Sequence, residues 1–178
     1  MPRLFTGLEI PDEISEPLSM LRGGLPGARW IDPENYHMTL RFIGDVDDDV
    51  AQEIAYLFGK VRRGPFEVRL DGLSPFGGRR PRAVVANVAG SQALMELQAE
   101  HERLMQRAGL EPEGRKFTPH VTLARLRDSS SQQVADYLSM RAAYRSAPFS
   151  VSRFVLFSAR ESVGGGPYVV EAAYPLAA

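Results

Sequence analysis

The sequence contains no cysteine, and that absence excludes several kinds of chemistry. Without thiols the chain has no disulfides, no thiolate zinc site, no iron–sulfur ligation and no thiol nucleophile. It also lacks any run approaching 18 apolar residues, and its N-terminal segment has no apolar core of the kind found in signal peptides. We therefore expect a cytoplasmic protein from a reducing compartment.

The sequence also has almost no excess of either charge, because its formal net charge is -1. Lysine occurs only at Lys60 and Lys116, so that 19 of the 21 basic residues are arginine. Near-neutral charge argues against broad coating of a nucleic acid, but it leaves room for a local phosphate site. The planar fork of arginine suits phosphate, although a codon bias toward arginine explains the same count.

The length of 178 residues, with 44% hydrophobic and 24% charged residues, predicts one globular domain over residues 1–178 with a sizeable core. Apolar spacing and turn residues predict short helices between strands, several of them joined as hairpins. We expect an α+β fold with mainly antiparallel sheets rather than a doubly wound parallel one. The expected strands are 3–10, 28–31, 37–43, 66–73, 82–89, 117–126, 149–160 and 168–174, and the expected helices are 12–22, 48–61, 91–108 and 132–143, with a hairpin turn at 164–167.

One short motif occurs twice. His37-Met38-Thr39-Leu40 and His120-Val121-Thr122-Leu123 each start a predicted strand, one in each half of the chain. Three histidines and four threonines would produce a His-x-Thr pair by chance only about 0.07 times. The recurrence indicates an internal repeat that carries function.

In a strand, the two-residue spacing of His and Thr places both side chains on one face. Side chains alternate between the two faces, so the His and Thr of one motif point the same way and the apolar residues point to the core. Simple solvent exposure of a polar pair is the alternative for either motif alone. Its occurrence in both halves favours a shared site.

Two opposed His-x-Thr units fit phosphoryl chemistry. In-line displacement at phosphorus needs an acid and a base on opposite sides, and imidazole serves either role near neutrality. The hydroxyls of Thr39 and Thr122 can donate to the nonbridging oxygens, where negative charge accumulates. No metal is expected, because a metal site needs three or more convergent ligands and only two histidines are placed for it.

The paired motifs resemble those of the 2H phosphoesterase superfamily, and the flanking sequence is similar to the bacterial RNA 2′,3′-cyclic phosphodiesterases, also called 2′-5′ RNA ligase-like proteins. The similarity spans essentially the whole chain. It includes RLFTGLEIP near the N-terminus, RWIDPENYHMTLRFIGD and RKFTPHVTLARL around the motifs, PFGGRRPRAVV between them, and FVLFSAR with GPYVVEAAYPL at the end.

The resemblance implies two pseudo-symmetric lobes whose antiparallel sheets face a central cleft, with helices on the outside. It implies hydrolysis of a 2′,3′-cyclic phosphate at an RNA end to a 2′-phosphomonoester. We further expect no cofactor and a monomeric protein. By that analogy His37 protonates the leaving 3′ oxygen and His120 activates water, although near-symmetry leaves the two roles interchangeable.

The chain departs from many relatives at Thr118, where they carry an arginine. Arg41, Arg115 and Lys116 are candidate substitutes, and Arg41 has the same strand parity as His37 and Thr39, which predicts a phosphate contact. Arg125 matches the family's T-L-A-R text. It has the wrong parity unless its strand bulges, so it is either a phosphate-binding or a structural residue.

Several other features have a structural explanation beside a functional one. His101 is expected on a helix face near the core edge, and the acidic run from Asp45 to Asp49 is expected to start a helix. Phe76 and Tyr168 are candidates for base stacking, or else ordinary core or surface aromatics. The arginines at 79, 80 and 82 either hold an RNA backbone or form a solvated hairpin tip.

Two other readings of function stay open. The missing arginine at position 118 leaves room for a module that binds RNA ends with little turnover. Alternatively, the enzyme ligates 2′-5′ RNA or hydrolyses another small cyclic phosphate.

Overall fold

The protein is described by a computed structural model over residues 3–159 and 166–177. Its elements, in chain order, are β1 (Arg3–Glu9), α1 (Asp12–Ser19), β2 (Ala28–Trp30), the 3-10 turn η1 (Pro33–Asn35), β3 (His37–Asp45), α2 (Asp48–Phe58), β4 (Phe66–Val68), β5 (Leu70–Phe76), β6 (Ala83–Val88), α3 (Gln92–Arg107), β7 (His120–Leu126), α4 (Ser131–Ser139), β8 (Phe149–Val151), β9 (Arg153–Ala159) and β10 (Tyr168–Pro175).

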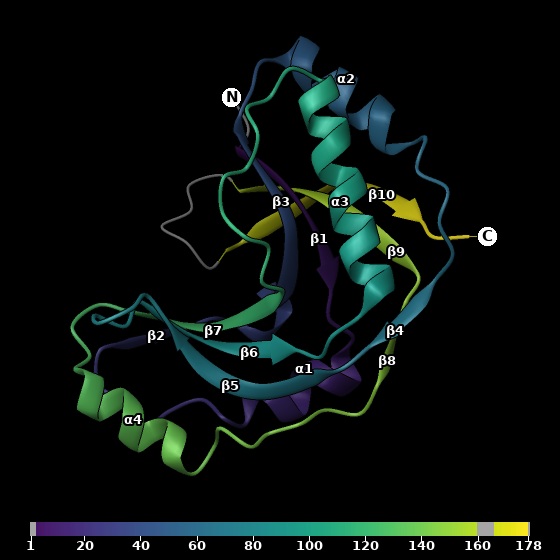
Figure 1. Ribbon diagram of the computed structural model, residues 1–178. Helices are drawn as coiled ribbons and strands as arrows, with labels where there is room; N and C mark the ends of the chain where they lie inside the picture. Colours follow the sequence, from purple (N-terminus) through teal and green to yellow (C-terminus); the bar gives the residue numbers. More distant parts are fainter. Residues whose placement is uncertain (1–2, 160–165, 178) are drawn as a thin grey trace.

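The strands pair in antiparallel fashion, which confirms the predicted α+β class. The main sheet has the order β10-β9-β1-β3-β7-β6-β5, with β2 on β7, and β4 and β8 form a separate two-stranded sheet. β3 and β7 share one registered pair, Met38 with Val121. The sheet therefore divides there into two arms, seen in Figure 1 as β3, β1, β9 and β10 in the upper part and β7, β6 and β5 in the lower part.

The helices cover the arms on their outer sides, and one hydrophobic core runs through both arms. α3 contacts β3 and α2 in the upper arm, and α4 contacts β5 in the lower arm (Figure 1). The upper arm joins strands from both ends of the chain, because β1 lies between β3 and β9. The termini of the fold are thus tied into the arm that carries His37.

Several predicted strands have different limits in the structure. The segment 66–73 is divided into β4 and β5, and the segment 149–159 into β8 and β9, because the chain leaves the small sheet and enters the main one. The predicted strand 117–126 begins only at His120. Position 160, and positions 164 and 165 of the predicted turn, lie outside the described residues.

β3 contains a bulge directly after Thr39. Its register with β1 passes from Thr39 to Arg41 and skips Leu40. A bulge of this kind reverses the face that the following side chains occupy. Leu40 and Arg41 are therefore both buried, and Phe42 returns to the face of His37.

β7 contains the equivalent bulge at the equivalent place. Its register with β6 passes from Thr122 to Ala124 and skips Leu123. Leu123 and Ala124 are both buried, and Arg125 returns to the face of His120 and Thr122. The two motifs thus share a local backbone irregularity as well as a sequence.

His101 is a core residue rather than one at the core edge. Its side chain is fully buried in α3, between the rings of Phe58 and Phe154 at centroid distances of 4.7 and 4.5 Å. Its Nδ1 lies 2.9 Å from the hydroxyl of Thr6, and burial lowers the pKa of His101 to about 3. It therefore remains neutral and takes no part in the cleft.

The acidic run starts a helix, as predicted. The Asp47 carboxylate accepts the backbone N–H of Val50 at 2.9 Å, and α2 begins at the next residue, Asp48. Within the described residues, no helix has the length and apolarity needed to cross a bilayer.

We predict that Gly7→Ala destabilises the fold. Gly7 pairs with Thr39, and a Cβ there would lie 2.8 Å from the carbonyl oxygen of Met38, closer than such atoms approach. We expect a loss of about 1–3 kcal/mol in the free energy of unfolding, measured by urea denaturation.

Gly90→Ala is the matched control, because a Cβ at Gly90 meets nothing within 4 Å. Equal stability of the two variants would contradict the close approach of β1 to β3.

Candidate active site

The two His-x-Thr motifs meet where the arms join. His37 is the first residue of β3 and His120 the first of β7, and the residues that follow them pair with each other across the two strands. Since that central pair is fully buried, its neighbours point to the opposite face. His37, Thr39, His120 and Thr122 line one cleft of about 350 Å³.

The imidazole of His37 has a defined orientation. Its Nδ1 lies 3.0 Å from the carbonyl oxygen of Asn35, and a carbonyl can only accept a hydrogen bond. Nδ1 therefore carries the proton, and Nε2 is left with a lone pair. Nε2 lies 2.9 Å from the Thr39 hydroxyl, which donates to it in this tautomer.

His120 is oriented in the same way. Its Nδ1 lies 2.7 Å from the carbonyl oxygen of Thr118, again two residues before the histidine. The proton is therefore on Nδ1 and the lone pair on Nε2. Thr118 thus contributes its main-chain carbonyl to the site.

Both imidazoles are weaker bases than free histidine. Burial lowers the pKa of His37 to about 4, against the opposing effect of the Asn35 carbonyl, and the charges of His120 and Arg125 lower it further. Burial also lowers the pKa of His120, with a smaller contribution from Arg125. Both rings are therefore neutral at pH 7 in the free protein.

A second, aromatic pocket of about 190 Å³ continues the cleft past His37. It shares with the cleft the residues His37, Thr39, Arg125 and Tyr168, and it adds Arg3, Phe5, Phe42 and Ala159. The rings of Phe5 and Tyr168 lie 5.0 and 4.9 Å from the ring of His37. A flat, apolar group can enter on this side.

The candidate stacking residues from the sequence both reach the cleft. Tyr168 stands beside His37, and the ring of Phe76 lies 4.4 Å from that of His120. Their contact with a base stays a prediction. Aromatic rings therefore flank each imidazole, one set in each arm.

The lining of the two pockets is strongly one-sided in charge. Arginines at 3, 82, 115 and 125 contribute to it, and no Asp or Glu does so among the described residues. The whole chain carries 22 acidic residues, so their exclusion from the lining is a local feature. Such a surface attracts anions.

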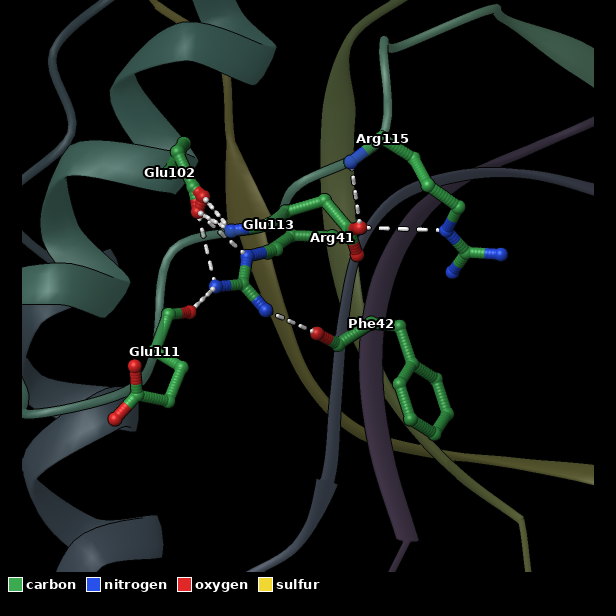
Figure 2. A network of polar contacts seen from close by, with 6 residues as sticks. All are labelled: Arg41, Phe42, Glu102, Glu111, Glu113 and Arg115. Atoms are coloured by element: carbon green, nitrogen blue, oxygen red, sulfur yellow. Dashed lines mark hydrogen bonds and ion pairs between the residues drawn. The ribbon is translucent and has the colours of Figure 1, made fainter.

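Arg41 does not lie in the cleft, contrary to the parity argument. Its side chain is 7% exposed and makes an ion pair with Glu102 at 2.9 Å, and it donates to the carbonyl oxygens of Phe42 and Glu111 at 2.6 Å each (Figure 2). The bulge at Leu40 is the physical reason, because it turns Arg41 to the other face. Arg41 is a structural residue.

Arg125 lies in the cleft because of the matching bulge in β7. The sequence also failed to identify Arg3, Phe5 and Phe42 as lining residues. One signal could have found Phe42, since it stands five residues after His37 just as Arg125 stands five after His120. The other two depend on how β1 pairs with β3, which no local pattern reveals.

Comparison with known proteins gives a consistent result. Residues 10–162 match the family model of the 2′-5′ RNA ligase superfamily. The RNA 2′,3′-cyclic phosphodiesterase of Aquifex aeolicus is 32% identical over 151 residues, covering 80% of this chain and 79% of that protein. The protein of the same name from Aeropyrum pernix is 40% identical over 111 residues, but the match spans only 61% of this chain and 62% of the relative.

Solved structures agree on the fold. The crystal structure of E. coli LigT complexed with 3′-AMP superposes with a TM-score of 0.81 at 25% identity, covering 99% of both chains. A crystal structure described as a phosphoesterase gives the same TM-score at 23% identity. The resemblance found in the sequence is confirmed, and the chain belongs to the 2′-5′ RNA ligase superfamily.

Proposed function

We propose that this protein hydrolyses 2′,3′-cyclic phosphate ends of RNA to 2′-phosphomonoesters by metal-independent acid–base catalysis. The observation that carries the proposal is the pair of imidazoles with Nδ1 held by a carbonyl, which line one cleft and each have a hydroxyl two residues on. The names of the relatives in Aquifex aeolicus and Aeropyrum pernix support the substrate class.

The reaction is an in-line displacement. A water oxygen attacks phosphorus opposite the 3′ oxygen and gives its proton to Nε2 of His120. The bond from phosphorus to the 3′ oxygen breaks, and that oxygen takes the proton carried by Nε2 of His37. The product has a 2′-phosphate and a free 3′-hydroxyl, and exchange with solvent restores the protons on the two rings.

The surroundings of the two rings support this assignment of roles. His37 is enclosed by aromatic rings, with those of Phe5 and Tyr168 at 5.0 and 4.9 Å from its own ring. The hydrogen bond of His120 to its carbonyl lies at an exposed position, where water has access. A base that must bind water suits the open side, and an acid suits the enclosed side.

Hydroxyl and guanidinium donors complete the phosphate site. The Thr39 hydroxyl bonds to the neutral His37 ring in the free protein, and it turns to a nonbridging oxygen when Nε2 is protonated. Thr122 has the matching place beside His120, and Arg125 adds a positive charge. These donors stabilise the charge that accumulates on the nonbridging oxygens.

The acid takes up its proton from solvent when the substrate binds. In the free protein the low pKa of both rings leaves them neutral at pH 7. A cyclic phosphate anion between them favours the charged form of an imidazole and raises its pKa. One ring is then protonated and the other neutral, which is the state that the reaction needs.

Two other activities are distinguished by direct assays. If the protein binds a 2′,3′-cyclic nucleotide without forming product, it is an RNA-end binding module. The family name raises 2′-5′ ligation, which is the same displacement with an RNA 5′-hydroxyl in place of water as the nucleophile and the 3′ oxygen again as the leaving group. Water is far more abundant than RNA ends, so net hydrolysis is the expected direction.

We also propose that residues 1–178 act as one domain, as a monomer, in the cytoplasm. The absence of cysteine supports the compartment, and the length of 178 residues supports one domain. Size-exclusion chromatography with light scattering tests the monomer, and a dimer mass would refute it.

We predict that His37→Ala and His120→Ala each reduce turnover of a 2′,3′-cyclic nucleotide by about 10²–10⁴-fold, because each removes one proton-transfer group. Initial rates of 2′-phosphate formation provide the measurement, with circular dichroism to confirm folding. EDTA is expected to leave the wild-type rate unchanged.

His101→Gln is the control histidine, because His101 lies in the core and outside the cleft. Near wild-type turnover in a folded His37 or His120 variant would exclude the two-histidine mechanism, and inhibition by EDTA would exclude metal independence.

The pH dependence of kcat/KM is predicted to be bell-shaped, with its maximum below pH 6.5. The free enzyme needs one protonated and one neutral imidazole, and both pKa values are lowered below the ordinary value of about 6.5. At lower pH the base is lost by protonation, and at higher pH the acid is lost by deprotonation.

Arg125→Met moves this maximum to higher pH, because it removes a charge that lowers both pKa values. A maximum centred above 6.5 in the wild type would contradict the role of burial.

We predict that Arg125 affects catalysis and that Arg41 affects stability. Arg125→Met lowers kcat by about 10²-fold with little change in stability, since it removes a donor to the phosphate. Arg41→Met leaves the partly buried Glu102 carboxylate without its guanidinium partner, and we expect a loss of about 1–3 kcal/mol in the free energy of unfolding. Kinetics and urea denaturation of both variants test the contrast, and the opposite pattern would restore Arg41 as the phosphate residue.

A further inference from the structure

The segment between α3 and β7 brings one more cation to the cleft. Arg115 lies on this segment and lines the cleft, although its side chain is 86% exposed. Its Nε donates to Glu113 at 3.3 Å, and its backbone N–H donates to the same carboxylate oxygen at 3.1 Å. Among the described residues, no hydrogen bond reaches its two terminal nitrogens, and Figure 2 shows them pointing away from the network.

The backbone that carries Arg115 is fixed from inside the protein. Arg41 uses all three guanidinium nitrogens, on Glu102 and on the carbonyl oxygens of Phe42 and Glu111. Glu102 in turn accepts the backbone N–H of Glu113, at 3.2 Å to one of its oxygens. The ion pair of Arg41 with Glu102 therefore anchors the loop at two points immediately before Arg115 (Figure 2).

The two arginines of this network differ in burial and in how many of their guanidinium nitrogens are hydrogen-bonded. Arg41 is buried and fully bonded, so it holds the loop and has no capacity for a ligand. Arg115 is anchored at its backbone and at Nε, while its terminal fork is exposed at the cleft. Such a fork binds phosphate oxygens in a bidentate manner.

Arg115 and Arg125 have different places in the site. Arg125 lies in β7 on the face of His120 and Thr122, lines both pockets and lowers the pKa of both imidazoles. Arg115 lines only the cleft, and its side chain is 86% exposed. The cyclic phosphate carries one negative charge, and Arg125, two hydroxyls and two imidazoles are available to it. The exposed guanidinium of Arg115 therefore suits a second anion.

An RNA end supplies that second anion one nucleotide away. The terminal nucleotide is linked on its 5′ side by a phosphodiester, whereas a cyclic mononucleotide has no second phosphate. The lining of the cleft contains no carboxylate among the described residues, so nothing there repels a continuing RNA backbone. Cationic contacts of this kind fix the register of a strand without reading its bases.

We infer that Arg115 binds the phosphodiester on the 5′ side of the terminal nucleotide, exchanging its contact with Glu113 for a phosphate. This inference rests on the proposed function and deepens it. The protein is then selective for RNA chain ends over free cyclic mononucleotides. Arg115 is a specificity residue that contacts the RNA on the 5′ side of the terminal nucleotide.

The test compares two substrates with the same terminal nucleoside. One is adenosine 2′,3′-cyclic phosphate, and the other is the adenylyl-adenosine dinucleotide ending in a 2′,3′-cyclic phosphate. Wild-type protein is expected to have the higher kcat/KM on the dinucleotide. Arg115→Gln is expected to lower that value by about tenfold and to change the mononucleotide value by less than about twofold.

A charge-retaining variant and a control variant complete the design. Arg115→Lys keeps the charge without the fork, so its dinucleotide value is expected between those of wild type and Arg115→Gln. Arg145→Gln removes an exposed arginine that pairs with Asp71 outside the cleft, and both substrates are expected to keep wild-type values. The salt dependence for the dinucleotide should also weaken by about 0.7 in logarithmic slope in Arg115→Gln.

The outcomes separate the two proposals. Wild-type protein that hydrolyses neither substrate refutes the proposed function. Active wild-type protein whose Arg115→Gln variant loses both substrates equally, or neither, refutes the inference alone. Equal loss would place Arg115 on the cyclic phosphate itself.

Discussion

Each imidazole in the cleft is oriented by a hydrogen bond to a main-chain carbonyl of its own segment. The bonds from Nδ1 of His37 to Asn35 and from Nδ1 of His120 to Thr118 select one tautomer and leave Nε2 available in the cleft. A carbonyl cannot donate, so this choice is independent of pH as long as the bond persists. The site would lose its acid and its base together if the turns before β3 and β7 changed.

The arrangement of the strands brings these two oriented rings together. β3 and β7 are joined by one residue pair, and each has a bulge directly after the threonine. The bulges decide which positively charged groups face the substrate. In β3 the bulge sends Arg41 inward, where it anchors the loop of Arg115, and in β7 it sends Arg125 into the cleft. The same bulge in both strands therefore places Arg41 in a structural network and Arg125 in the cleft.

Period-two alternation was sufficient to predict that His37, Thr39, His120 and Thr122 share a face, and the four side chains do line one cleft. Their chemical roles stay a prediction. The same rule gave the wrong place for Arg41, because the alternation of residue types in β3 does not reveal the bulge after Thr39. It left Arg125 undecided for the same reason. Phe5 and Arg3 reach the site only through pairing of β1 with β3, a non-local contact that periodicity does not encode.

The central claim is that both Nε2 atoms act on one phosphorus, from opposite sides. A crystal structure with a nucleoside vanadate, which imitates five-coordinate phosphorus, tests it most directly. The account predicts one apical oxygen within hydrogen-bond distance of Nε2 of His120 and the other within the same distance of Nε2 of His37. A vanadate with both rings on one side, or with either ring out of reach, would contradict it.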